Sequence, residues 1–119
     1  MVSDKNLIKI TTSFRKGMLG KNPPKGRCFM VCLALHGYLG VMGICSELVV
    51  IDLETPNTYT NHSFLRLPDK RILDPTADQF PESGLPAVYL GELPALYLEW
   101  MKQCADDSEV NHKFLKILG

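Results

Sequence analysis

Two short β-type runs around a proline-containing turn are the feature that most restricts how this chain can fold. The first run, 61–67, reads NHSFLRL, and the second, 71–74, reads RILD. Between them Pro68-Asp69-Lys70 has the composition of a tight turn, and the second run stops where Asp74 precedes a proline. The sequence therefore predicts an antiparallel hairpin with a three-residue loop.

The residues before this hairpin predict two helices joined by a loop of forced conformation. Between 6 and 19 apolar residues recur at three- and four-residue steps, which favours an amphipathic helix, although 10–12 (Ile-Thr-Thr) also suits a strand. Paired prolines and glycines exclude a helix from 20–26. A buried helix is expected to begin within a residue or two of Cys28, because one helical face would carry Cys28, Val31, Cys32, Leu35 and Leu39.

The remaining segments complete the predicted domain. A β-branched run at 44–53 predicts a strand and 55–58 a turn, while 93–104 has helical spacing with Tyr97, Trp100 and Met101 as core residues. A last helical piece at 110–118 could be capped by Asp106, Asp107 or Ser108. The order indicates a single α+β domain, 1–119, with N-terminal helices packed on a small antiparallel sheet and a C-terminal helix.

The composition narrows the classes of function. The 119 residues are 45% hydrophobic, enough for one core, and 13 basic residues balance 13 acidic ones, so we expect no nucleic-acid or membrane partner. Apolar runs are far shorter than a membrane span, and the start of the chain lacks a secretory signal, which predicts a cytoplasmic protein, with non-classical export left open. The four cysteines are interpreted as thiols, and no cofactor is expected.

Three residues carry the chemistry that we predict. Cys28 is expected where a loop enters a helix, and a helix N-terminus stabilises a thiolate. A thiolate nucleophile needs a base, and of the three histidines His62 is the one with an orienting carboxylate within reach. If Leu67 lies opposite Arg71, then His62 is the diagonal neighbour of Asp74 on one face of the hairpin, whereas a slip of one residue would separate them.

An acyl-transfer site also requires hydrogen-bond donors for the oxyanion that develops. The backbone N–H of Cys28 is one candidate, and the side-chain amide of Asn22, six residues upstream, is the other.

The order of these residues resembles the papain-like and transglutaminase-like superfamily, in particular its small bacterial and phage members. The resemblance rests on Gly26-Arg27-Cys28, Asn61-His62-Ser63-Phe64 and the segment ILDPTADQF at 72–80, and it covers residues 22–80, about half of the chain. It implies a catalytic triad of Cys28, His62 and Asp74. Asn22 stands where papain-like enzymes carry a glutamine. Many relatives have an aromatic residue beside the cysteine and a tryptophan shortly after the histidine, and this chain departs from that pattern, with Phe29 after Cys28 and Ser63-Phe64 after His62.

Other interpretations of the same residues stay open. Cys28 could be a small buried core residue, and Asp78 competes with Asp74 as the orienting carboxylate. Cys28, Cys32 and His36 at four-residue steps could instead be three zinc ligands, although structural zinc sites usually take ligands from two loops. His112 is interpreted as a solvated helix residue.

We therefore expect a cysteine-dependent enzyme that transfers an acyl group from an amide through a thioester, either a peptidase or a glutamine deamidase or transglutaminase. Its partner would be a protein or peptide substrate, with specificity residing in 55–60 and 80–90. The alternative from another class is a non-catalytic binding or regulatory protein on the same fold, and a metal-binding module is a third. Oligomeric state is not predicted.

Overall fold

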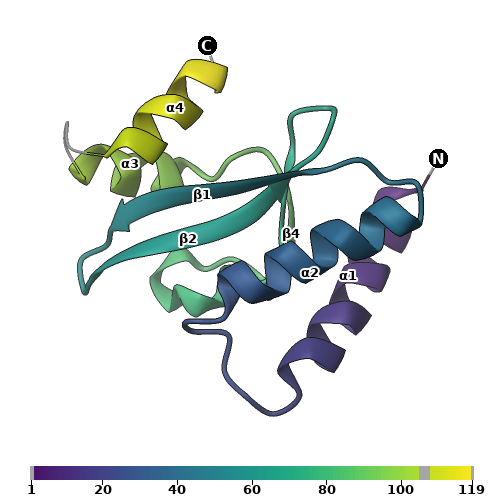
Figure 1. Ribbon diagram of the computed structural model, residues 1–119. Coiled ribbons are helices and arrows are strands. Elements are labelled where there is room, and N and C mark those ends of the chain that lie inside the picture. Colours follow the sequence, from purple (N-terminus) through teal and green to yellow (C-terminus); the bar gives the residue numbers. More distant parts are fainter. Residues whose placement is uncertain (1, 105–107, 119) are drawn as a thin grey trace.

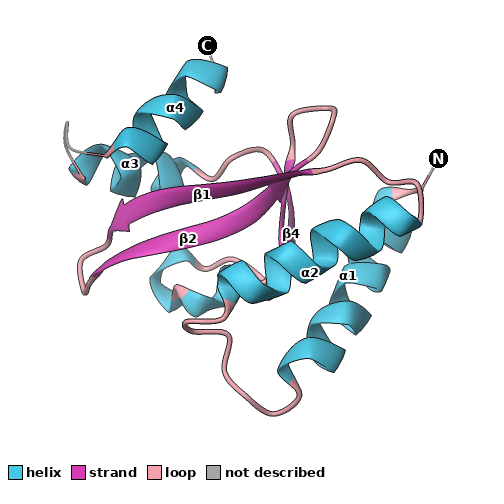
Figure 2. Ribbon diagram, in the orientation of Figure 1, coloured by secondary structure: helices cyan, strands magenta, loops and turns pink. Residues whose placement is uncertain are grey.

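A four-stranded antiparallel sheet lies between two pairs of helices (Figures 1 and 2). The structure is a computed structural model that describes residues 2–104 and 108–118. Its elements are α1 (Asp4–Leu19), α2 (Cys28–Val41), β1 (Glu47–Glu54), β2 (Tyr59–Arg66), β3 (Ile72–Asp74), β4 (Tyr89–Gly91), α3 (Ala95–Gln103) and α4 (Glu109–Leu118), with short 3₁₀ helices at Ala77–Gln79 and Pro81–Ser83. The predicted α+β class, with N-terminal helices, then a sheet, then C-terminal helices, is confirmed.

Alternation along the strands divides the core into two clusters, one on each face of the sheet. Phe64 and Ile72 face α3 and α4, whereas Leu65 and Leu73 face α1 and α2. The first cluster contains Val49, Ile51, Leu53, Phe64, Ile72, Phe80, Tyr97, Trp100, Met101 and Phe114. The second contains Leu7, Cys32, Leu35, Leu39, Leu65, Leu67, Leu73 and Val88. The predicted core positions of α3 are therefore confirmed.

The hairpin has the register that its turn predicts. Leu65 pairs with Leu73, and the N–H of Leu67 donates to the carbonyl of Arg71 at 2.8 Å. Lys70 has a φ of 75°, the left-handed conformation that the last position of a three-residue loop needs. Because this register continues to Asp74, His62 and Asp74 project from the same face of the sheet.

Strand β4 was not predicted, because the segment 80–90 was interpreted as a loop. The structure pairs β4 antiparallel with β3, and Asp74 lies opposite Tyr89. Three residues are too few to show the alternation that identifies a strand. The pairing with β4 holds the backbone of Asp74 at the end of β3, a strand that lies between β2 and β4.

The helix boundaries agree closely with the sequence. The strand alternative at 10–12 is wrong, since these residues lie within α1, and α2 begins at Cys28. Ser108 caps α4 by accepting a hydrogen bond from the N–H of Asn111 at 3.2 Å. Asp106 and Asp107, the other predicted caps, lie outside the described residues. None of the helices in the described part of the chain is long and apolar enough to cross a bilayer.

Candidate active site

Cys28 is the first residue of α2, and the chain enters the helix through a turn at Gly26, whose φ is 79°. Arg27 at the N-cap makes no capping hydrogen bond with its side chain, and the first turn of α2 has no acidic residue. The partial positive charge of the free N–H groups at the helix start therefore acts on the thiol. The Cys28 residue is 5% exposed.

Asp74 is a fully buried carboxylate that accepts three hydrogen bonds. Its Oδ2 atom accepts from Nε2 of His62 at 2.5 Å and from the hydroxyl of Tyr97 at 2.7 Å. Its Oδ1 atom accepts from the backbone N–H of Thr76 at 3.0 Å. Because these donors come from β2, α3 and the turn after β3, the orientation of the carboxylate is fixed from three directions. Buried charge is tolerated when it is satisfied in this way.

The imidazole of His62 is held among aromatic rings. Phe80 and Tyr97 both contact it edge-on, with ring centroids 4.9 Å and 5.3 Å away, and Phe64 lies at 6.2 Å. His62 is fully buried, so the ring is fixed by packing as well as by Asp74. With Nε2 occupied by Asp74, Nδ1 is the nitrogen left for a second partner, and it makes no aligned hydrogen bond within the described residues.

Cys28 and His62 interact and change each other's ionisation. Burial acts to raise the pKa of the Cys28 thiol, but the interactions with His62 and with the backbone of Ser63 outweigh burial, so the pKa is lowered. Burial likewise acts to lower the pKa of His62, but the charge and hydrogen bond of Asp74, helped by Cys28, raise it from 6.5 to about 9. These opposite shifts favour a thiolate beside an imidazolium.

A hollow of about 340 Å³ opens beside Cys28. Three segments line it. They are 25–29 at the start of α2, 55–61 in the loop after β1 and the first residues of β2, and 79–82 after β3. The two loops in which we expected specificity thus flank the thiol, although specificity itself stays a prediction. The lining includes threonine hydroxyls, the amides of Asn57, Asn61 and Gln79, and one residue of each charge, Lys25 and Glu82.

The structure does not bring Asn22 to this hollow. Asn22 is exposed and lines a separate hollow beside Arg15 and Ala87. Asn57, Asn61 and Gln79 are the side-chain amides that line the hollow with Cys28, and the Oε1 atom of Gln79 is buried without a hydrogen-bond partner among the described residues. Gln79 belongs to the ILDPTADQF segment, and nothing in its local sequence predicts a place beside Cys28.

Asp78 has a different partner from the one considered in the sequence analysis. Its carboxylate accepts two hydrogen bonds from the guanidinium of Arg15 on α1, at 2.6 Å and 2.7 Å. Arg15 also donates to the carbonyls of Pro75 and Ala87. Asp74, and not Asp78, therefore contacts His62, while Asp78 anchors the turn that follows β3 to α1.

The proposed zinc ligands have other partners. The thiol of Cys32 donates to the carbonyl of Ser63 at 3.2 Å, and Nδ1 of His36 lies 2.8 Å from the hydroxyl of Ser46. Among the described residues no group of three or more His, Cys, Asp or Glu side chains could hold a metal ion. His112 is exposed on α4, as expected.

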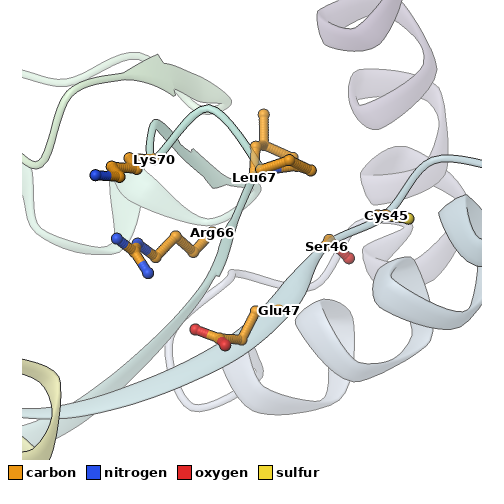
Figure 3. A pocket seen from close by; sticks show the side chains of 7 residues that line it. Cys45, Ser46, Glu47, Arg66, Leu67 and Lys70 are labelled. Carbon is orange, nitrogen blue, oxygen red and sulfur yellow. The ribbon is translucent and has the colours of Figure 1, made fainter. Parts of the chain in front are cut away.

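A second hollow, of about 300 Å³, lies at the other end of β2 and holds a different set of groups (Figure 3). The side chains of Arg66, Lys70 and Glu47 extend to the same side, whereas the sulfur of Cys45 points away from them. Among the described residues no histidine lines this hollow.

No protein-family model matches the chain, and comparison with curated proteins and with solved structures gave no significant match.

Proposed function

We propose that this protein is a cysteine-dependent acyl-transfer enzyme in which Cys28 is the nucleophile, His62 the proton carrier and Asp74 the group that orients His62. The observation that carries the proposal is the placement of a thiol at the start of a helix, beside an open hollow and next to a histidine that is hydrogen-bonded to a buried carboxylate. The lowered pKa of this thiol agrees with that placement. Such a combination is typical of activated cysteines, whereas structural buried cysteines are inert.

The geometry supports a two-step reaction on an amide. The Cys28 sulfur forms a bond to the acyl carbon, the carbonyl π pair moves to oxygen, and the tetrahedral species expels the amine, which takes a proton from His62. Water then attacks the thioester while His62 accepts its proton, and the acid leaves as the thiol is regenerated. Hydrolysis of a peptide bond or of a glutamine amide follows this scheme, and an amine acceptor would give transamidation.

The first test uses p-nitrophenyl acetate as a general acyl donor. We expect a stoichiometric burst of p-nitrophenol followed by slower turnover, with the acetyl group found on Cys28 by mass spectrometry. Cys28→Ala should lose both phases, whereas Cys45→Ala, which removes an exposed thiol remote from His62, should keep them. Acetylation of Cys28 no faster than that of Cys45 would refute the proposal.

The second candidate is a non-catalytic protein-binding domain on the same fold. Four large apolar side chains exposed on α2 favour it: Phe29, Met30, Leu33 and Val41. A binding protein needs its surface and not its thiol, so Cys28→Ala would leave such a protein's partner and effect unchanged. An enzyme would lose its effect with the same substitution.

A further inference from the structure

Charge is divided unequally between the N-terminal helices and the rest of the chain. Residues 5–46 contain α2, the loop before it and all of α1 except its first residue, and they hold seven basic residues and no acidic one. All 13 acidic residues and the other six basic ones lie elsewhere in the chain. The net charge of zero, from which we expected no membrane partner, hides this division.

Five of these seven basic residues are exposed lysines. Three lie on α1 and two in the loop that leads to α2: Lys5, Lys9, Lys16, Lys21 and Lys25. The three on α1 follow one another at steps of four and seven, on the helix face opposite the buried Leu7 and Thr11. None of the five forms an ion pair with another described residue, so their charge is available to a partner.

The outer face of α2 is apolar. The helix contains no Asp, Glu, Lys or Arg. Met30 and Leu33 are both 49% exposed and Val41 is 89% exposed, on the side of the helix opposite the buried Cys32 and Leu39. Surface helices normally carry polar residues on the face that points away from the core. The outer face of α2 is therefore suited to contact with another apolar surface.

The lysines and the apolar side chains belong to one surface. Both helices cover the same face of the sheet, and α2 lies beside α1 (Figure 1). Phe14 of α1 stacks on Tyr38 of α2 with ring centroids 5.1 Å apart. The outward positions of the two helices thus point away from the sheet together. We call this surface, with the five lysines and with Met30, Leu33 and Val41, the outer helical surface.

We propose that the outer helical surface docks on an anionic lipid bilayer. Apolar side chains would enter the boundary between headgroups and acyl chains, while the lysines reach the lipid phosphates. A protein partner is the other occupant that exposed apolar side chains suit, but protein interfaces are depleted in lysine, whereas anionic headgroups attract it. The inference goes beyond the proposed function and stands without it, so Cys28→Ala should bind the bilayer as the wild type does.

The first experiment is co-sedimentation of the full chain with lipid vesicles. One set contains phosphatidylcholine and phosphatidylserine in a ratio of about 3:1, and the other contains phosphatidylcholine alone. We expect the affinity for the mixed vesicles to be higher by on the order of tenfold or more, and to fall as salt is raised from about 0.05 M to about 0.5 M. Equal binding to the two sets would overturn the inference.

Charge variants locate the contact. Lys9→Gln/Lys16→Gln should weaken binding to the mixed vesicles by on the order of 30-fold, because each lysine near an anionic surface contributes about fivefold. The matched control, Lys113→Gln/Lys116→Gln, removes the same charge from exposed positions on α4, across the sheet. It should stay within about threefold of the wild type. Equal losses in the two double variants would overturn the assignment to α1 and α2.

Apolar variants test the second half of the surface without changing its charge. Met30→Ser/Leu33→Ser should weaken binding by on the order of tenfold. The control is Val110→Ser/Ile117→Ser, which changes two exposed apolar residues of α4 and should leave binding unchanged. Wild-type binding by the α2 variant would contradict the inference. Failure of the wild type to bind either kind of vesicle would also overturn it, and a dimer that Met30→Ser/Leu33→Ser abolishes would then assign the surface to a second copy of the chain.

Discussion

Cys28 and Cys32 lie one helical turn apart on α2, yet the pKa values of their thiols are shifted in opposite directions. Both are buried, and both contact the backbone of Ser63. Cys32 donates to the Ser63 carbonyl, and its pKa is raised by burial and by the charges of Asp74 and Cys28. The pKa of Cys28 is lowered although burial acts on it in the same direction as on Cys32.

The difference shows that the partner of a buried thiol, more than its burial, decides whether the thiol ionises. Cys28 has the interaction with His62 and the open helix N-terminus, whereas Cys32 is one turn further along and faces a carbonyl acceptor. A hydrogen bond donated to sulfur favours the thiolate, and one donated by sulfur favours the thiol. Cys28 should lose its reactivity when its interaction with His62, which Cys32 lacks, is removed.

The largest effect is expected for His62→Gln, which should make Cys28 behave like Cys32. At about pH 6.5 an ordinary thiol of pKa about 8.5 is only about 1% ionised, so alkylation of Cys28 by iodoacetamide should slow by up to on the order of 100-fold. Site-resolved mass spectrometry measures the rate. His36→Gln, which changes a histidine on α2 that contacts Ser46, is the matched control and should leave it unchanged. Equal rates in the wild type and His62→Gln would remove His62 from the site.

The second effect is a pH dependence of the free energy of unfolding that arises from the interaction of His62 with Asp74. A histidine whose folded pKa, about 9, exceeds its unfolded value of 6.5 stabilises the fold fully below the unfolded value, and this contribution is lost as pH rises through the folded pKa. Cys28, with a lowered pKa, contributes in the opposite sense, since its stabilisation is lost as pH falls. Cys28→Ala removes that term and leaves Asp74 to raise the pKa of His62.

In Cys28→Ala we therefore expect the free energy of unfolding to fall by roughly 1–3 kcal/mol between pH 6 and 9.5. Urea titrations at several pH values measure it. In the double variant Cys28→Ala/His62→Gln the part of the slope below about pH 8 should disappear, whereas the raised pKa of Cys32 still lowers stability above that pH. A flat profile in the single variant would mean that Asp74 does not favour the charged imidazole.

The third effect concerns Tyr97, whose hydroxyl donates a hydrogen bond to the buried carboxylate of Asp74. Tyr97→Phe removes the 2.7 Å hydrogen bond to the buried carboxylate and should cost about 1.5–3 kcal/mol in the free energy of unfolding at neutral pH. Urea denaturation compares it with Tyr38→Phe, which changes an exposed tyrosine stacked on Phe14 and should cost less than about 0.5 kcal/mol. Equal costs would show that the Tyr97 hydroxyl contributes little to holding Asp74.

The sequence predicted the parts of this site that depend on local chemistry. The turn at 68–70 sets the register that places His62 and Asp74 on one face, and the loop at 20–26 determines that α2 begins at Cys28. Tyr97 and Gln79 were not predicted, since they reach the site through tertiary packing. Tyr97 follows the apolar stripe of α3 and looks like any core residue, although its hydroxyl reaches a carboxylate 23 positions away.

The smallest effect is expected for Cys32→Ala, which tests whether Cys32 influences the reactivity of Cys28. Cys32 donates a weak hydrogen bond to Ser63 and fills core space, so its loss should cost about 1–2 kcal/mol of stability. Because Cys32 is protonated, it adds no charge next to Cys28, and alkylation of Cys28 should stay within about twofold of wild type in the same mass-spectrometric assay. Cys45→Ala, at an exposed thiol, is the control for loss of a cysteine as such. A change of tenfold or more in Cys28 reactivity would mean that the two thiols act as one coupled pair, and that the activation of Cys28 depends on α2 as well as on His62.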